Sequence, residues 1–363
     1  MALAAGMEEA RVVFGYLRAP KDTIENASHA WCCVKIEGEY RFVDCWLAFP
    51  SQPQNKYQIE EHWFLTKPPD MIYTHFPCEP HDQCLEPAIS LETFFALPYV
   101  WPTFFAHRLK MIRYNPDTLI VTDDQMCHLT IRVDPNTICI AMVETEDGQV
   151  MRALAQCRFA QTIDGHPEKV YKIKAVLPKN APHGWLKLFV APLEWLDTHM
   201  FYRPDMPSND INSMVDNYSG NGGHMSSSTA MTLTLQVPDL AAVFPLTQHV
   251  SGHVRSALPE HPFGFVHLHP CQYEFNVQEP QCYYLYPLQT YNFFIRGGES
   301  HHKLAIRSPG GKLFKLMYYP QDHLYDGSVT LSEVGKWTLI CLTHNSTGWL
   351  VVATWMCTHP LSS

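Results

Sequence analysis

The segment HAWCCVKIEGEYRFVDCWL, residues 29–47, constrains the fold of this chain more than any other, because it has the pattern of a tight β-hairpin. β-Branched and aromatic residues fill both arms, and Glu37-Gly38 lies between them, where a hairpin turn is expected. A turn of two residues pairs Ile36 with Glu39. This pairing sets the register of the whole hairpin.

The predicted register brings a histidine and an aspartate to one face of the hairpin. It places His29 opposite Trp46 and Trp31 opposite Asp44, so that His29 and Asp44 become diagonal neighbours about 7–8 Å apart at the backbone. An imidazole oriented by a carboxylate is a general base, and such a pair normally activates a Cys or Ser nucleophile. His29 and Asp44 are therefore the candidate catalytic residues. The alternative is a structural hydrogen bond between them.

The nearby cysteines do not supply that nucleophile. Alternation along a strand turns Cys32 and Cys45 to the face opposite His29, and Cys33 lies roughly 13 Å along the strand. Residues 1–28 contain no cysteine. A nucleophile must lie within hydrogen-bond reach of its base. We therefore predict a dyad that lacks its nucleophile, and we favour the structural interpretation over catalysis.

The hairpin resembles the His and Asp strands of the transglutaminase-like (papain-like Cys-His-Asp) fold. HAW begins at His29, Asp44 follows in VDCW, and the preceding RVVFGYLR (residues 11–18) resembles the strand before the His strand in that family. There the nucleophilic Cys opens a helix well upstream, and we expect that helix to be absent here. VDCWL also departs from the usual VDxTWG.

Three later segments resemble a narrower family. HWFLTKPPDMIYTHFP (62–77), ISLETFFALPYVWPTFF (89–105) and GWLVVATWMC (348–357) are similar to fungal cytokinesis protein 3 and, more distantly, to the kyphoscoliosis-peptidase and hillarin group. The resemblance implies a domain without the catalytic Cys that serves as a binding module. Longer family members carry an N-terminal domain that binds Pro-rich peptides. We therefore expect the chain to be the C-terminal portion of such a protein.

Composition favours protein partners over membranes and nucleic acids. No apolar run approaches the 18 residues of a membrane-spanning helix, and the N-terminus lacks the basic and apolar regions of a secretory signal. A net charge of −10 argues against binding to nucleic acid or anionic lipid. The 12 cysteines lie in apolar strand patterns, so reduced thiols and a cytoplasmic location are expected.

The chain divides into regions of different pattern, and an α+β fold is predicted. A partial transglutaminase-like domain without its nucleophile helix covers residues 1–113, and β-sandwich (immunoglobulin-like) modules cover residues 114–195 and 261–363. Between them, residues 196–260 are expected to be a linker. Its segment 203–230 is rich in Ser, Asn, Gly and Met and is predicted to be mobile.

An internal repeat supports two sandwich modules. GWLKLFVA begins at Gly184 and GWLVVATW begins at Gly348, and the turn at Asp147-Gly148 has a counterpart at Pro309-Gly310-Gly311. Asp-Gly favours a type I′ hairpin turn, whereas Ser308-Pro309-Gly310 favours type II. Chance similarity among generic strands is the alternative explanation.

A second cluster of polar residues lies in HLHPC. A strand there places His267, His269 and Cys271 on one face, and these side chains are able to bind zinc. A strand edge with outward polar residues explains the same pattern, and no second ligand pair with standard spacing follows. We predict no metal site and no cofactor from the sequence.

Two functions of different classes remain. The first is a non-catalytic interaction protein of cytokinesis. As the resemblance implies, it promotes septum formation coupled to the actomyosin ring at the division site (bud neck or septum), with chitin synthase, IQGAP-like and F-BAR proteins as partners. The second is a cysteine peptidase or protein-glutamine acyl transferase, in which His29 moves the proton, Asp44 orients it, and the nucleophilic Cys lies outside this chain.

Overall fold

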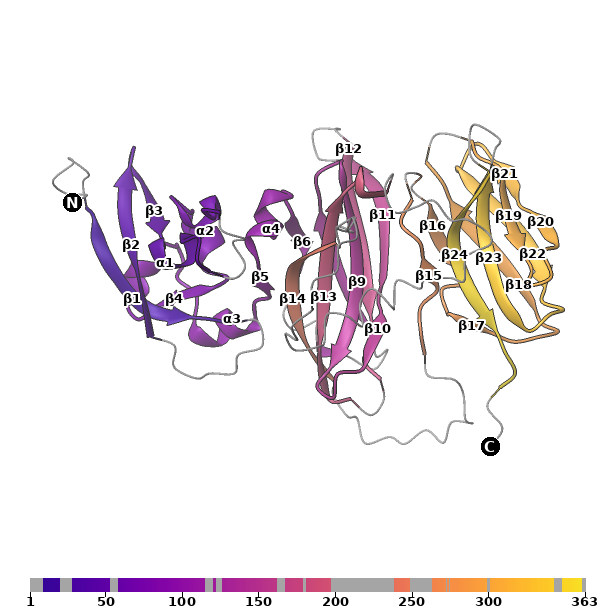
Figure 1. Ribbon diagram of the computed structural model, residues 1–363, viewed down its shortest axis with the longest axis horizontal. Coiled ribbons are helices and arrows are strands. Elements are labelled where there is room, and N and C mark those ends of the chain that lie inside the picture. The colour runs from indigo at the N-terminus through magenta and orange to yellow at the C-terminus, as the bar shows by residue number, and fades with distance from the viewer. Residues whose placement is uncertain are drawn as a thin grey trace, which may run out of the picture. The chain divides into compact units, whose positions relative to one another are not determined.

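The computed structural model is mostly β-strand (Figure 1). It describes residues 9–19, 28–52, 58–114, 120–121, 126–161, 167–178, 181–196, 238–248, 263–271, 273, 275–298, 301–342 and 348–360. The predicted mobile segment, residues 203–230, lies outside the described residues. Two compact units are distinguished, residues 1–108 with 240–245, and residues 109–239 with 246–363.

Unit 1 is built on a four-stranded sheet with short helices. The strand order is β3-β2-β1-β4. The strands are β1 (Arg11–Leu17), β2 (Ser28–Ile36), β3 (Glu39–Val43), β4 (His75–Pro77) and, outside this sheet, β5 (Tyr99–Val100). The α-helices are α1 (Cys45–Ala48), α2 (Pro68–Met71), α3 (Leu91–Ala96) and α4 (Pro102–Ala106), and the 3₁₀ helices are η3 (Glu61–Trp63) and η4 (Pro80–Gln83).

The predicted hairpin is β2-β3, and its register is confirmed. Ile36 pairs with Glu39 across a two-residue turn in which Glu37 and Gly38 have φ of +52° and +83°. Two positive φ values in succession are typical of a type I′ turn, whose twist matches that of the flanking strands.

The predicted pairing fails beyond Val43. Strand β3 ends there because Asp44 becomes the N-cap of α1, its side chain accepting hydrogen bonds from the backbone of Trp46 and Leu47. Trp46 is therefore helical and is not paired with His29 as a strand residue. The two rings still meet edge to face, with centroids 5.6 Å apart.

Two β-sandwich modules follow in the chain, and the first takes its final strand, β14, from the predicted linker, although residues 240–245 of that strand are grouped with unit 1. The sheets of the first module have the orders β11-β12-β8-β6 and β10-β9-β13-β14. The strands are β6 (Lys110–Arg113), β7 (Ile120–Val121), β8 (Cys127–Arg132), β9 (Thr137–Thr145), β10 (Val150–Arg152), β11 (Leu154–Gln161), β12 (Pro167–Ala175), β13 (His183–Pro192) and β14 (Asp239–Gln248). Residues 196–260 are thus not entirely linker, because they include β14.

The second module follows the same plan. Its sheets have the orders β16-β18-β22-β21 and β20-β19-β23-β24-β15. The strands are β15 (His267–Leu268), β16 (Asn276–Glu279), β17 (Tyr284–Leu285), β18 (Thr290–Arg296), β19 (Leu304–Arg307), β20 (Leu313–Lys315), β21 (Met317–Tyr319), β22 (Leu324–Thr330), β23 (Gly335–Leu342) and β24 (Trp349–Cys357).

Each strand from β6 to β14 has a counterpart in the second module whose number is higher by ten, from β16 to β24. The parallel pairing of β7 with β14 also recurs between β17 and β24. In each module the first sheet has the strand order of the A-B-E-D sheet of an immunoglobulin domain, as in β6-β8-β12-β11. The other sheet contains the order C-F-G, as in β9-β13-β14, so the arrangement is immunoglobulin-like. The predicted repeat therefore has the wrong register, because β13 corresponds to β23, whereas GWLVVATW lies in β24.

The two turns of the predicted repeat occupy equivalent places, between β9 and β10 and between β19 and β20, but both predicted turn types are wrong. Gly148 and Gly311 have φ of +84° and +88°, and each donates its N–H to the carbonyl three residues earlier, at Thr145 and Ser308. Asp147 and Gly310 do not have positive φ. Each connection is therefore a type I turn followed by a left-handed glycine, the common three-residue hairpin loop.

The two modules are joined by a buried glutamine. The side chain of Gln156 on β11 donates to the carbonyl of Val277 on β16 at 3.0 Å and accepts from its N–H at 2.6 Å. Leu154, on the same strand, is part of the apolar core of the second module. A side chain of the first sandwich thus packs in the core of the second.

Substitution of Gln156 should test this junction. Gln156→Ala leaves the Val277 N–H without its partner, whereas the Val277 carbonyl still accepts from Gln281. We expect a loss of about 1–3 kcal/mol in the free energy of unfolding, measured by urea titration. The exposed Gln149→Ala is the control. Equal stability of the two variants would contradict this role for Gln156.

Candidate functional site

The structure brings His29 and Asp44 into direct contact. Nε2 of His29, on β2, lies 2.6 Å from Oδ2 of Asp44, at the N-cap of α1. The Asp44 side chain is 1% exposed and that of His29 is 14% exposed. The imidazole therefore forms the accessible end of a buried pair.

Asp44 accepts four hydrogen bonds. Oδ1 accepts from the backbone N–H of Trp46 at 2.9 Å and of Leu47 at 3.0 Å. Oδ2 faces the Nε2 atoms of both His29 and His75, the latter at 3.0 Å. Burial alone raises the pKa of the Asp44 carboxyl, but the hydrogen bonds from His29, His75 and Leu47 outweigh it and hold the pKa well below its usual range.

His75 is a member of the site that the sequence did not indicate. It opens β4, is fully buried, and its Nδ1 lies 2.8 Å from Oγ1 of Thr74. Burial lowers the pKa of His75, although the hydrogen bond with Asp44 opposes this shift. His75 pairs with Leu17 of β1, so its position depends on a long-range strand pairing. No local spacing rule connects it with Asp44.

Aromatic rings surround the two imidazoles. His29 stacks on Trp31 with centroids 6.1 Å apart, and His75 meets Trp31 at 4.9 Å and Trp63 at 5.5 Å. Trp31 and Trp63 are buried in the core of unit 1, whereas Trp46 is 56% exposed. Buried rings therefore contact His75, whereas His29 also contacts the exposed Trp46.

The three cysteines near the hairpin differ in their surroundings. Cys32 and Cys45 are exposed, and Cys33 is buried in the core, where burial raises the pKa of its thiol to about 12. Within the described residues, no thiol makes a hydrogen bond with His29.

The residues considered for zinc in HLHPC do not converge. His267 stacks on Tyr283 with centroids 3.8 Å apart, and Nε2 of His269 lies 2.8 Å from Oγ1 of Thr354. The Cys271 thiol donates to the carbonyl of Tyr273. Strand β15 has only two residues, so it cannot align three side chains on one face.

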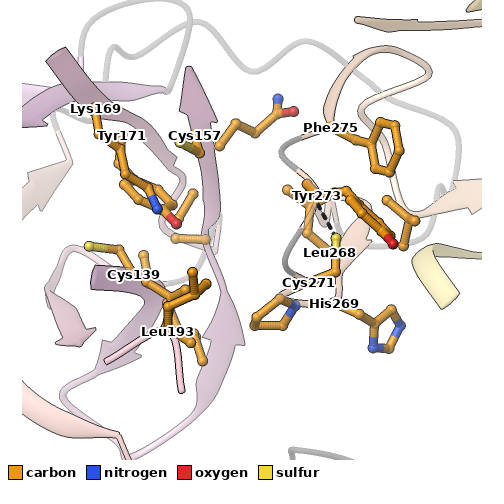
Figure 2. A pocket seen from close by; sticks show the side chains of 18 of the residues that line it. Cys139, Cys157, Lys169, Tyr171, Leu193, Leu268, His269, Cys271, Tyr273 and Phe275 are labelled. Atoms are coloured by element: carbon orange, nitrogen blue, oxygen red, sulfur yellow. Dashed lines mark hydrogen bonds between the residues drawn. The ribbon is translucent and has the colours of Figure 1, made fainter. Parts of the chain in front are cut away.

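A cavity of about 130 Å³ lies between the two sandwich modules (Figure 2). Its wall combines apolar and polar side chains from both modules. Those labelled in Figure 2 include Cys139, Cys157, Lys169 and Tyr171 of the first module and His269, Cys271, Tyr273 and Phe275 of the second. Burial lowers the pKa of His269 to about 3, so this wall presents a neutral imidazole.

The fold and the site together define a chain with an N-terminal unit holding a His-Asp-His cluster and two immunoglobulin-like modules. A family model described as the CYK3 C-terminal Ig-like domain matches residues 268–357. This range covers the second module from β15 to β24. Within the described residues, no helix has both the length and the hydrophobicity needed to cross a membrane.

The chain is homologous to fungal cytokinesis protein 3, which confirms the predicted resemblance. It is 24% identical to cytokinesis protein 3 of Schizosaccharomyces pombe over 366 residues, and 24% identical to Cytokinesis protein 3 of Saccharomyces cerevisiae over 383 residues. Each alignment covers 95% of this chain, but only 37% and 38% of those proteins. Hillarin of Drosophila melanogaster is 31% identical over 124 residues, 30% of this chain and 15% of its own length.

The buried His62 should make the stability of unit 1 depend on pH. Its ring stacks on Phe105 with centroids 4.4 Å apart, and its Nε2 is buried without a hydrogen-bond partner among the described residues. Burial lowers the pKa of His62 from 6.5 to about 4. Between these values the unfolded chain binds a proton that the folded chain does not, so stability falls as the pH decreases from 6.5 to 4.

We expect His62→Phe to reduce this acid destabilisation. The free energy of unfolding, measured by urea titration at pH 7 and pH 4.5, should fall less in the variant than in the parent chain. His81→Phe is the matched control, because the His81 side chain is 74% exposed. An unchanged pH dependence in His62→Phe would contradict the buried, neutral state of His62.

Proposed function

We propose that this chain is a non-catalytic, transglutaminase-like interaction protein that acts in cytokinesis and promotes septum formation coupled to the actomyosin ring. The observation that carries the proposal is the similarity of 95% of the chain to two fungal proteins named cytokinesis protein 3. The alignments extend through unit 1 and both sandwich modules. The proposal therefore concerns the whole described assembly.

The contacts of Asp44 support a structural role for the dyad. Two of its four hydrogen bonds cap α1 and a third binds the buried His75. A buried carboxylate needs such partners whether or not the site performs chemistry. The remaining bond, to His29, completes that set.

The sandwich modules offer surfaces for protein partners. Strand β21 lies at an edge of its sheet, and Met317 and Tyr319 on it are 67% and 48% exposed. Exposed edge strands with apolar side chains are common sites of peptide addition. We propose partners of the cytokinetic ring and septum machinery, namely IQGAP-like and F-BAR proteins and chitin synthase, and a cytoplasmic location at the bud neck or septum.

Recruitment to the division site tests the proposal. His29→Ala combined with Asp44→Asn removes the chemistry of the dyad, but Asn is also a favourable N-cap and should preserve α1. A fluorescent fusion of this double variant should still reach the division site in fungal cells. Met317→Glu with Tyr319→Glu, or deletion of residues 275–363, should abolish recruitment.

The paired substitutions of Met317 and Tyr319 are a more specific test than the deletion. The deletion also removes the module that packs on Leu154, so loss of folding alone explains a negative result. Met317 and Tyr319 are exposed, and their replacement should leave the melting temperature unchanged. Failure of the folded double variant of His29 and Asp44, with normal recruitment of the surface variant, would contradict the interaction function and point to catalysis.

A cysteine peptidase or protein-glutamine acyl transferase is the second candidate. The 2.6 Å contact of His29 with Asp44 favours it, because a carboxylate-oriented imidazole with one accessible side suits a general base. In this version the nucleophilic Cys comes from sequence outside this chain. The thiolate attacks an amide carbonyl, and His29 transfers the proton to the leaving amine.

An activity assay separates the two candidates. Incubated with a glutamine-containing peptide and an amine acceptor, the chain should release ammonia only at the background rate, because no thiol among the described residues is hydrogen-bonded to His29 and Cys33 is buried in the core. Mass spectrometry of the peptide measures both hydrolysis and acyl transfer. Turnover that disappears in His29→Ala would show that the chain is an enzyme.

A further inference from the structure

Three side chains that can each offer one metal-ligating atom converge in unit 1. His29 comes from β2, Asp44 from the N-cap of α1 and His75 from β4. Their ligand atoms all lie within 4.8 Å of one another. We propose that His29, Asp44 and His75 form a Zn²⁺-binding site, a property that goes beyond the proposed role in cytokinesis.

The contacts of Thr74 suit a metal-binding form of His75. Oγ1 of Thr74 lies 3.3 Å from the Met71 carbonyl, to which it donates, and 2.8 Å from Nδ1 of His75. When Thr74 donates to Met71, Nδ1 of His75 carries the ring proton and Nε2 directs a lone pair toward Asp44. In the metal-free form Nε2 of His75 donates to Oδ2 of Asp44 at 3.0 Å, whereas in the tautomer protonated at Nδ1 the Nε2 lone pair is available to a cation held between the two atoms.

The supporting shell of such a site is already in place. Histidine ligands usually donate the other ring N–H to a fixed acceptor, and Thr74 occupies that position for His75. Ligating carboxylates are themselves held by hydrogen bonds, and the N–H groups of Trp46 and Leu47 hold Oδ1 of Asp44. Oδ2 therefore remains directed toward the two imidazoles.

The donor set favours zinc over the hard cations. Two imidazole nitrogens and one carboxylate oxygen match Zn²⁺, whereas Ca²⁺ and Mg²⁺ prefer sites made of oxygen atoms. Zinc sites with three protein ligands leave a fourth position for water. His29 lies at the accessible side of the cluster, so the ion and its water enter there. The 2.6 Å contact must lengthen on binding, and the partly exposed His29 is the ligand with room to move.

A bound ion would connect three elements that are distant in the sequence. β2, α1 and β4 each supply one ligand, so the metal stabilises the folded form of unit 1 relative to the unfolded chain. The site is also distinct from a catalytic dyad in composition, because it needs His75. Substitution of His75 therefore separates metal binding from acid-base chemistry.

Titration of the full chain with Zn²⁺ tests the site. Chelator-treated protein should bind one tight equivalent of Zn²⁺, measured by calorimetry, and Co²⁺ in its place should give the intense visible absorption of a four-coordinate ion. His29→Asn should weaken this equivalent by at least about tenfold. His81→Asn, which alters an exposed histidine of the same unit, should leave it unchanged.

Two further measurements exclude misfolding as the explanation. His29 is the least buried of the three ligands, so His29→Asn should keep the circular dichroism spectrum and the chelator-treated melting temperature of the parent chain. His75→Gln should lose the same equivalent of Zn²⁺. Absence of a tight equivalent in the parent chain, or equal Zn²⁺ binding by the folded His29→Asn and His81→Asn variants, would overturn the proposal.

Discussion

The buried carboxylate of Asp44 is the interaction on which unit 1 depends. Four hydrogen bonds converge on it, and together they fix three different parts of the chain. The two backbone bonds end β3 and start α1, and the two imidazoles attach β2 and β4 to that corner. Removal of one partner from a buried charge costs more than the bond itself, because the charge is left without compensation. The corner therefore has to assemble as a unit.

Unit 2 depends instead on a repeated topology. The strand order β6 to β14 recurs as β16 to β24, including the parallel pairing of an early strand with the last one. In the second module β23 and β24 are separated by residues 343–348, whereas in the first module β13 and β14 are separated by residues 193–238. The first sandwich thus closes with a strand that is remote in sequence. This separation explains why composition placed β14 in a linker.

The features predicted correctly from sequence are those set by neighbouring residues. Period-two alternation and the Glu37-Gly38 turn specify the β2-β3 register, and this register brings His29 near Asp44. The errors arise where tertiary structure decides. Asp44 is the N-cap of α1 and therefore ends β3, where alternation predicts that the strand continues. The pairing of β4 with β1 places His75 at the site. Likewise, the turns at Gly148 and Gly311 are predicted in the correct places, but their types are not. In both, the left-handed glycine follows the two central residues of the turn, and this makes the turn type I.

The requirements of Asp44 change how a His-Asp pair should be interpreted. Its carboxylate must be stabilised by hydrogen bonds in any folded form of unit 1, because it caps α1 and its side chain is 1% exposed. An imidazole beside it satisfies this need without taking part in a reaction. The pair alone is thus as compatible with a scaffold as with an enzyme, and the nucleophile is the group that distinguishes them. His75 adds a different criterion, because a third ligating side chain makes the corner a chelate, which neither a scaffold nor a peptidase requires.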